Sequence, residues 1–304
     1  MVRKHARRAV KAAFALALAI PIVLGGTANA QTTATPTITV GTKNFTEAFV
    51  LGQLYKQALE AKGFKVAYKE NIGSSELIDT ALTSGKINFY PEYTGVLALN
   101  IAGVKPAPKT AAATYAAAKA FEEKRGYTML RQTPFFDADS FTVLTSTARK
   151  YGLKTISDLK KVGAFKLGGF PECQTRNTCF AGYVKQYGLQ DATFASVGSV
   201  SPYAALDSGS VLAADVFSTD PPLAKPSKYT VLSDPKHITG FQNVAPIVKA
   251  SVASAAGASF TSTVNAVSSK LTLPAIAAMN KAVIIDKKSA ATVAQQFLKA
   301  NGLV

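Results

Sequence analysis

The sequence is poor in the residues on which most enzyme active sites depend. Its 304 residues include no tryptophan, two cysteines and two histidines. One histidine, His5, lies in the N-terminal segment described below, so His237 is the only other one. The GxSxG, HExxH, P-loop and GxGxxG motifs are absent, and two thiols with a single imidazole cannot complete a tetrahedral zinc site. We therefore expect no catalytic residue, no metal and no cofactor.

Long apolar runs are also scarce, and the one that stands out lies at the N-terminus. It spans residues 12–24 and is interrupted only by Pro21. It follows a basic head without acidic residues (Arg3, Lys4, Arg7, Arg8 and Lys11) and precedes the small residues Ala28 and Ala30. This layout is typical of a secretory signal, and the run is too short to span a bilayer. We expect residues 1–30 to be a cleaved signal peptide, no lipoprotein anchor because no cysteine is nearby, and a periplasmic or extracellular location.

Acidic residues are few, 18 against 34 basic ones, which gives a formal charge of +16. Loss of residues 1–30 would remove five basic residues and lower the charge to +11. Lysines such as Lys56, Lys62, Lys65, Lys69 and Lys86 are scattered singly and not clustered, so they indicate a solvated basic surface and not a nucleic-acid interface. We expect a monomer with no nucleic-acid partner.

The two cysteines, Cys173 and Cys179, lie six positions apart. Two nearby cysteines in an exported protein usually pair, and the spacing is not that of a CxxC redox motif. The sequence therefore predicts a Cys173–Cys179 disulfide.

Strand and helix patterns alternate along almost the whole chain after residue 36. Apolar segments and turn signals predict strands near 37–40, 64–68, 87–90, 128–130, 141–144, 165–167, 213–217 and 244–248. Helical periodicity between them, and in three segments after residue 260, predicts a parallel α/β arrangement. About 270 residues of such units exceed the usual single domain, so we expect two lobes.

Six segments, in order, carry a resemblance to a known family. They are Gly41–Glu47 (GTKNFTE), Gly85–Gly95 (GKINFYPEYTG), Lys150–Leu159, Gly168–Cys173, Ala205–Gly209 and Phe217–Asp220. Together they resemble the glycine betaine/choline-type substrate-binding proteins of ABC importers over nearly the whole chain after the signal. The resemblance implies a non-catalytic protein that captures a small quaternary-ammonium or betaine-like compatible solute, an osmoprotectant, and delivers it to a membrane permease.

The resemblance further implies an α/β, two-lobed periplasmic-binding-protein fold of type II with two crossover strands and the ligand in the cleft. Residues 31–137 plus 242–304 would form lobe 1, and 138–241 would form lobe 2 with the crossover segments, which are expected near residues 137–141 and 236–243. Such proteins hold a trimethylammonium group against aromatic faces. The implied ligand-binding residues are Lys43, Asn44, Tyr93, Thr94, Phe136, Asp137, Asp139, Arg176, Phe217, Thr219, Asp220 and Phe241. We expect Tyr93 to be a cleft residue that lies outside the core.

Some residues depart from the family pattern. Ala48 and Val96 stand where relatives often carry polar residues. The acidic Asp137 and Asp139 lie where relatives commonly carry a further tyrosine that contacts the trimethylammonium group. A carboxylate suits a cation but disfavours a ligand's own carboxylate.

Several alternatives remain open. The ligand could be another cationic or zwitterionic solute, such as an ergothioneine-like compound or an amino acid, and the two aspartates could serve acid–base chemistry in an extracellular enzyme. Among the single residues, Lys43 could be a surface charge and Arg176 a structural ion pair. Tyr93, Phe217 and Phe241 could belong to the core, and Asn44 and Thr219 could cap helices.

Overall fold

The fold is taken from a computed structural model, which describes residues 36–197 and 201–304. The expected signal peptide, residues 1–30, lies outside the described residues. Among those described, no helix combines the length and apolar character needed to cross a bilayer.

The first of two five-stranded sheets has the strand order β2-β1-β3-β10-β4. β1, β2 and β3 are parallel, whereas β10 runs antiparallel to both β3 and β4. The expected parallel arrangement holds for β1, β2 and β3, whereas β10 is antiparallel because the chain enters it from the opposite direction after its excursion through the second sheet. Its strands are β1 (Ile38–Lys43), β2 (Val66–Gly73), β3 (Phe89–Tyr93), β4 (Tyr127–Met129) and β10 (Val244–Lys249).

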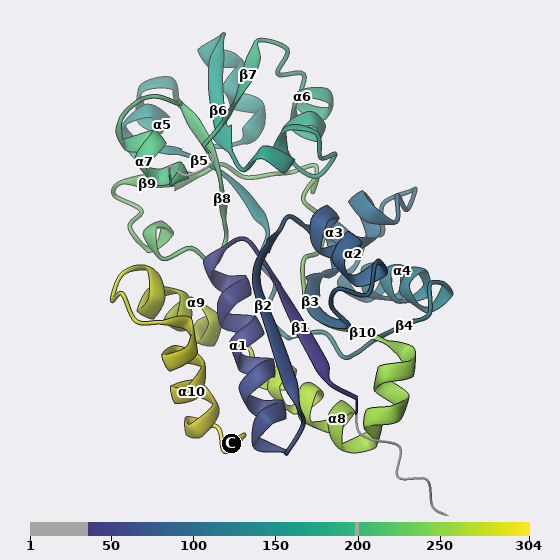
Figure 1. Cartoon of the computed structure of the whole chain (residues 1–304). Coiled ribbons are helices and arrows are strands. Elements are labelled where there is room, and N and C mark those ends of the chain that lie inside the picture. Colours follow the sequence, from purple (N-terminus) through teal and green to yellow (C-terminus); the bar gives the residue numbers. More distant parts are fainter. Residues whose placement is uncertain (1–35, 198–200) are drawn as a thin grey trace, which may run out of the picture. The chain divides into compact units, whose positions relative to one another are not determined.

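Helices cover both faces of this sheet, and alternate residues of β3 show the division. Phe89 and Tyr93 belong to the core formed with α1 and the C-terminal helices, whereas Tyr90 packs in the core on the other face. Figure 1 shows α1 and α10 side by side, in agreement with their packing. The helices are α1 (Thr46–Ala61), α2 (Ser75–Thr83), α3 (Thr94–Val96), the π-helix Leu97–Ile101, α4 (Ala111–Lys124), α8 (Ala250–Lys270), α9 (Leu273–Ile284) and α10 (Ala290–Ala300).

The second sheet has the order β7-β6-β8-β5-β9 and is mixed in the same way. Its strands are β5 (Asp139–Leu144), β6 (Phe165–Gly169), β7 (Ala192–Ser196), β8 (Ala213–Phe217) and β9 (Tyr229–Val231). Its helices are α5 (Thr145–Tyr151), α6 (Phe180–Tyr187), α7 (Pro202–Asp207) and the 3₁₀ turns Ile156–Val162, Pro171–Gln174 and Pro221–Ala224. The sequence did not predict α5, β7 or β9, which are short or half-exposed.

Two segments connect the sheets, from β4 to β5 and from β9 to β10. They pair with each other through an antiparallel bridge between Phe136 and Asn243, and the Asp137 amide donates to the Gln242 carbonyl at 3.1 Å. The segments expected to cross, near 137–141 and 236–243, are the ones that pair here. The division into lobes at residues 137 and 242 stays a prediction.

Candidate functional site

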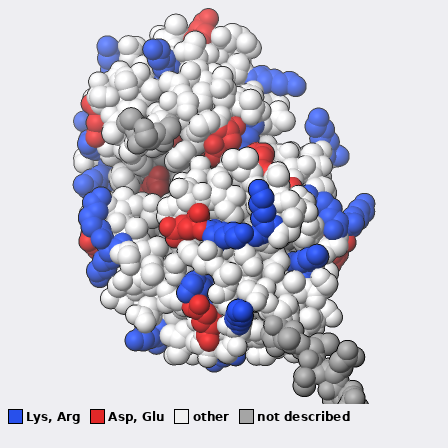
Figure 2. All heavy atoms as spheres, in the orientation of Figure 1, with Lys and Arg blue, Asp and Glu red and all other residues white. Residues whose placement is uncertain are grey.

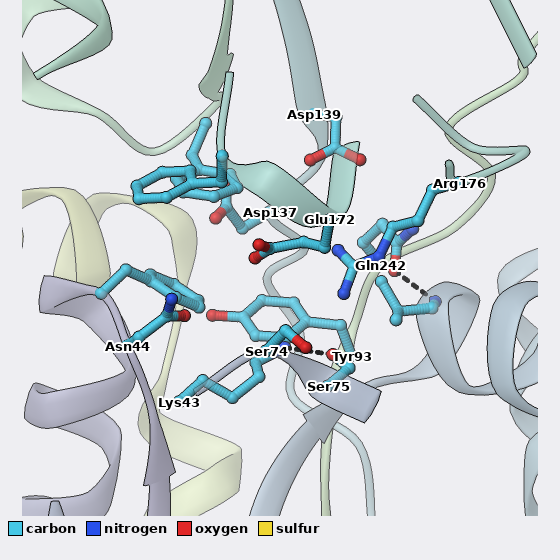
Figure 3. Close-up of a pocket in the computed structure, with 14 residues that line it drawn as sticks. Lys43, Asn44, Ser74, Ser75, Tyr93, Asp137, Asp139, Glu172, Arg176 and Gln242 are labelled. Atoms are coloured by element: carbon cyan, nitrogen blue, oxygen red, sulfur yellow. Dashed lines mark hydrogen bonds between the residues drawn. The ribbon is translucent and has the colours of Figure 1, made fainter. Parts of the chain in front are cut away.

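A pocket forms where strand ends of both sheets meet the two connecting segments (Figure 3). We call it the central pocket. Lys43 ends β1, Tyr93 ends β3 and Phe217 ends β8, and ligands of open α/β sheets gather outside such strand ends. Its lining residues are Lys43, Asn44, Phe45, Ser74, Ser75, Tyr93, Val96, Asp137, Asp139, Phe170, Glu172, Arg176, Phe217 and Gln242.

Four aromatic rings form one wall of the central pocket. The ring centroid of Phe45 lies 5.9 Å from that of Tyr93 and 5.0 Å from that of Phe217. Phe170 stacks on Phe217 with centroids 5.8 Å apart. Ring faces attract cations, and the protein itself shows this, because the Lys43 ammonium lies 4.0 Å from the Tyr93 centroid.

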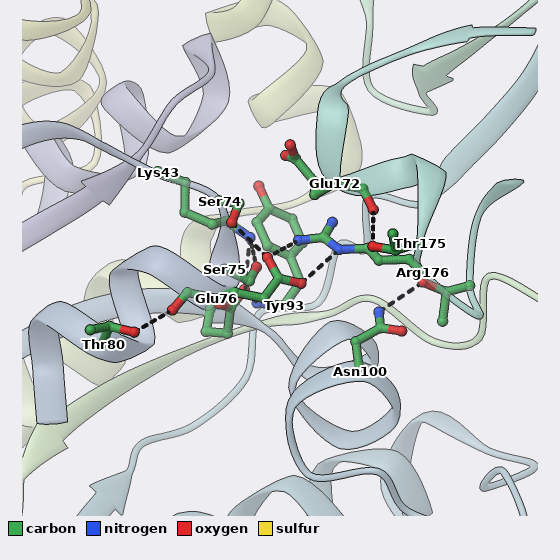
Figure 4. A network of polar contacts seen from close by, with 12 residues as sticks. Lys43, Ser74, Ser75, Glu76, Thr80, Tyr93, Asn100, Glu172, Thr175 and Arg176 are labelled. Carbon is green, nitrogen blue, oxygen red and sulfur yellow. Dashed lines mark hydrogen bonds and ion pairs between the residues drawn. The ribbon is translucent and has the colours of Figure 1, made fainter. Parts of the chain in front are cut away.

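Both basic side chains of the central pocket already have acidic partners. The Lys43 ammonium donates to Glu92 at 2.7 Å and to the Ser75 hydroxyl at 3.1 Å, in a buried pair. The Arg176 guanidinium makes two hydrogen bonds to Glu76, at 3.0 and 2.9 Å (Figure 4). Burial alone would raise the pKa of Glu76, but the bonds from Arg176 lower it to about 2. Arg176 thus forms the structural ion pair that the sequence left open, and it lines the pocket as well.

Two carboxylates of the central pocket are left without such partners. Among the described residues, the side chains of Asp139 and Glu172 accept no hydrogen bond from another residue, and Figure 3 shows both above the Tyr93 ring. Burial raises the pKa of Asp139 to about 6, although Arg176 and Lys43 oppose the rise. An entering cation would stabilise the ionised form of both groups.

Asp137 and Glu47 are buried more deeply. Asp137 is 4% exposed, and its Oδ1 accepts from the Ser218 hydroxyl and the Thr219 amide, both at 3.0 Å. Glu47, 3% exposed, accepts from the hydroxyls of Tyr93 at 2.7 Å and Thr219 at 2.6 Å. Burial raises the pKa of both carboxyl groups. Glu47 therefore ties the aromatic wall of the first sheet to the turn that follows β8.

Gly95 has a packing reason for its place in the EYTG segment. A Cβ atom there would lie 2.7 Å from the side chain of Gln242. The absence of that atom lets the Gln242 carboxamide accept from the Val96 amide at 3.0 Å and line the central pocket. The absence of a side chain at Gly95 thereby lets Gln242, in the second connecting segment, pack against the residues that follow β3.

The structure brings seven of the twelve predicted ligand residues together in the central pocket: Lys43, Asn44, Tyr93, Asp137, Asp139, Arg176 and Phe217. Thr219 and Asp220 line an adjoining cavity. Thr94 is buried and donates to the Phe241 carbonyl. Phe136 and Phe241 are 52% and 36% exposed and line neither cavity.

The expectation that Tyr93 lies outside the core is wrong. Its side chain is 4% exposed and belongs to the hydrophobic core of the first sheet. The strand period explains this, since Tyr93 shares the face of Phe89, and its position at the end of β3 lets it line the central pocket as well.

Sequence reasoning missed several lining residues, above all Phe45, Phe170, Glu172 and Gln242. The first three lie within segments that carry the family resemblance, and an aromatic or acidic residue within three positions of a strand end was the available signal. Gln242 gave no such signal, because its position depends on the pairing of the two connecting segments.

The predicted disulfide between Cys173 and Cys179 is confirmed. It closes the loop that carries Arg176, and the pocket residue Glu172 precedes it directly. The Asp215 carboxylate lies within 4.8 Å of both sulfur atoms, but sulfurs joined in a disulfide do not serve as thiolate ligands.

Comparison with known proteins gives consistent matches. A family model described as the substrate-binding domain of ABC-type glycine betaine transport systems matches residues 36–300. The glycine betaine-binding protein YehZ of Escherichia coli is 30% identical over 228 residues, covering 71% of this chain and 74% of that protein. A glycine-betaine-binding protein of Pseudomonas aeruginosa is 28% identical over 284 residues, covering 88% and 89%.

Among solved structures, a glycine betaine/carnitine/choline ABC transporter protein has a TM-score of 0.69 at 23% identity, covering 88% of this chain and 99% of that one. This likeness confirms the expected fold, α/β of the periplasmic-binding-protein type II class.

Proposed function

This chain belongs to the family of substrate-binding domains of ABC-type glycine betaine transport systems, and we propose that it captures a small quaternary-ammonium compound in the central pocket. The single observation that carries the choice of ligand is the composition of that pocket. Aromatic rings form one wall, and two carboxylates, Asp139 and Glu172, face the same space without a partner among the described residues. The aromatic rings and the carboxylates would both stabilise a bound methylated cation. A single well-placed, desolvated ring contributes about 2 kcal/mol or more.

The charge balance favours a cation that carries no carboxylate of its own. Asp137, Asp139 and Glu172 line the central pocket against Lys43 and Arg176, and both basic groups are paired with Glu92 and Glu76. A betaine carboxylate would have to compete for those pairs, whereas a choline-like ligand would not. Glycine betaine is thus the second candidate ligand, supported by the names of the relatives.

The wider role is a proposal on the same basis. The basic head and apolar run of residues 1–30 favour export to the periplasm or the exterior, where the protein would deliver its ligand to a membrane permease. Figure 2 shows the basic residues spread over the drawn face, which supports the proposal of a solvated basic surface. A monomer without a nucleic-acid partner stays part of the proposal. We propose binding without turnover, since the sequence lacks recognised catalytic motifs.

A thermal-shift screen followed by calorimetric titration tests this function. Choline and glycine betaine form the matched pair, with carnitine, ergothioneine and amino acids as further ligands. A ligand at 100 times its dissociation constant should stabilise the fold by about 2.7 kcal/mol. Choline should bind at least tenfold more tightly than glycine betaine, and Glu172→Gln should weaken choline binding without a change in the melt of the free protein. A screen in which no quaternary ammonium stabilises the protein would contradict the proposal.

A further inference from the structure

A second chamber adjoins the central pocket and is the larger of the two. Its volume is about 280 Å³, against about 40 Å³ for the central pocket. The two cavities share Phe45, Phe170, Phe217 and Asp137, so these residues border both. Phe217 lies 5.0 Å from Phe45 and 5.8 Å from Phe170 between ring centroids, so the three rings form a contiguous row at this border. The chamber therefore adjoins the proposed quaternary-ammonium site across a row of aromatic rings.

The charge lining the second chamber is of one sign. Glu47, Asp137 and Asp220 contribute carboxyl groups, and no lysine, arginine or histidine is found among the described residues that line it. Glu47 and Asp137 are nearly fully buried. Buried carboxylates without a basic partner are costly, and a bound cation would remove that cost.

Hydrogen-bond acceptors are in excess as well. Asn280, 1% exposed, lines the chamber and donates through Nδ2 to Glu47 at 2.8 Å and to the Thr219 hydroxyl at 3.2 Å. Its Oδ1 has no hydrogen-bond partner in the part of the chain that the structure describes. Asp220 accepts from the Tyr203 hydroxyl and the Phe217 amide, both at 3.1 Å. The Asn280 amide and the hydroxyls of Thr219 and Tyr203 already donate to oxygen atoms of the chamber, so a ligand that brings N–H groups would fit the acceptors that remain.

The rest of the chamber is apolar. Val216, Pro222 and Ile284 line it beside the phenylalanine rings. A bare metal ion would gain nothing from these groups, whereas an alkyl chain would bury apolar area against them.

We propose that the second chamber is a separate binding site for a protonated alkyl amine, whose ammonium group donates to Glu47, Asp137 and Asp220. A quaternary ammonium lacks N–H donors and suits the ring faces of the central pocket instead. The two sites would accordingly select different cations, and both could be occupied at once.

Titration of the purified protein with n-butylammonium chloride tests this proposal, with tetramethylammonium as the probe of the central pocket. Ile284→Trp fills the second chamber and should weaken n-butylammonium binding at least tenfold. Ile285→Trp is the matched control, because the neighbouring Ile285 is 49% exposed and lines neither cavity. It should bind as the original protein does. Asp220→Asn, which can keep both hydrogen bonds to Asp220, should weaken n-butylammonium severalfold and covers the case in which the tryptophan disturbs folding.

Glu172→Gln separates the two sites, since Glu172 lines only the central pocket. It should weaken tetramethylammonium and leave n-butylammonium within about twofold. If n-butylammonium instead competes with tetramethylammonium for a single site, or binds Ile284→Trp and Asp220→Asn unchanged, the second site does not exist. Failure of tetramethylammonium alone to bind would contradict the proposed function and leave the second site standing.

Discussion

At the scale of single residues, Tyr93 belongs to the core and to the central pocket at once. Its ring packs in the interior beside Phe89 and also lines the pocket, and its hydroxyl donates to the buried Glu47. Its substitutions should therefore affect stability and binding together.

We predict that Tyr93→Ala lowers the free energy of unfolding by about 3–5 kcal/mol, as for other large-to-small core changes. It should also weaken quaternary-ammonium binding by about tenfold or more, because about 1.4 kcal/mol is a factor of ten. Tyr93→Phe keeps the ring face and removes one partner of Glu47, so it should cost about 1–3 kcal/mol of stability and little affinity. Urea unfolding and calorimetric titration of both variants measure these effects. Equal losses of affinity in the two variants would show that the ring face does not contact the ligand.

We predict that Asp139 gives the ligand affinity a pH dependence. Burial raises the pKa of its carboxyl group to about 6, so the free protein carries a neutral carboxyl below that pH and a charged one above it. A cation favours the charged form, and its affinity should fall as the pH drops from 7.5 to 5, by up to about tenfold per unit of pKa difference between free and bound protein. Titrations across this range should show the fall, and Asp139→Asn should flatten it. If the affinity of Asp139→Asn fell with pH as steeply as that of the original protein, a group other than Asp139 would cause the pH dependence.

At the scale of elements, the segment between β6 and α6 positions two pocket side chains from the second sheet. The 3₁₀ turn Pro171–Gln174 carries Glu172, and the loop closed by Cys173 and Cys179 carries Arg176. Arg176 in turn pairs with Glu76 in the first turn of α2. The disulfide thus restrains the loop of the second sheet that contacts helix α2 beside the first sheet.

We predict that Cys173→Ser/Cys179→Ser lowers the free energy of unfolding by roughly 2.4 kcal/mol, the chain-entropy value for a loop of about seven residues. Ligand affinity should fall as well, because Glu172 and Arg176 lose part of their restraint. Denaturant unfolding and titration of the double variant provide the measurement. A ligand affinity equal to that of the disulfide-bonded protein would mean that the loop holds its shape without the bond.

At the scale of the whole molecule, the proposed site needs residues from both sheets. Lys43, Phe45 and Tyr93 come from the first, and Asp139, Glu172 and Phe217 from the second. Glu47 and Thr219 also join helix α1 to the turn after β8 by a hydrogen bond of 2.6 Å. A ligand in the central pocket would therefore hold elements of both sheets together.

We predict that a bound quaternary ammonium slows amide hydrogen exchange in two places, at residues 93–96 after β3 and at residues 217–219 after β8. Local opening at either place would break ligand contacts. The free energy of opening should therefore rise at both places, by up to the free energy of ligand binding. Exchange measured by mass spectrometry with and without ligand, using the Glu172→Gln variant as the weak-binding control, tests this. Protection confined to one of the two segments would contradict a site shared by both sheets.

Local sequence determined most of the secondary structure and part of the site. Strand β8 has the predicted bounds, 213–217, because apolar periodicity and turn residues act over a few positions. The strand-end motifs around Lys43, Tyr93 and Phe217 pointed to the pocket for the same reason. Tertiary structure alone decided that β10 is antiparallel, that Tyr93 is core and that Lys43 and Arg176 are paired with acids. Each of these depends on a partner 46 to 159 positions away along the chain, and packing between such distant residues leaves no local pattern in the sequence.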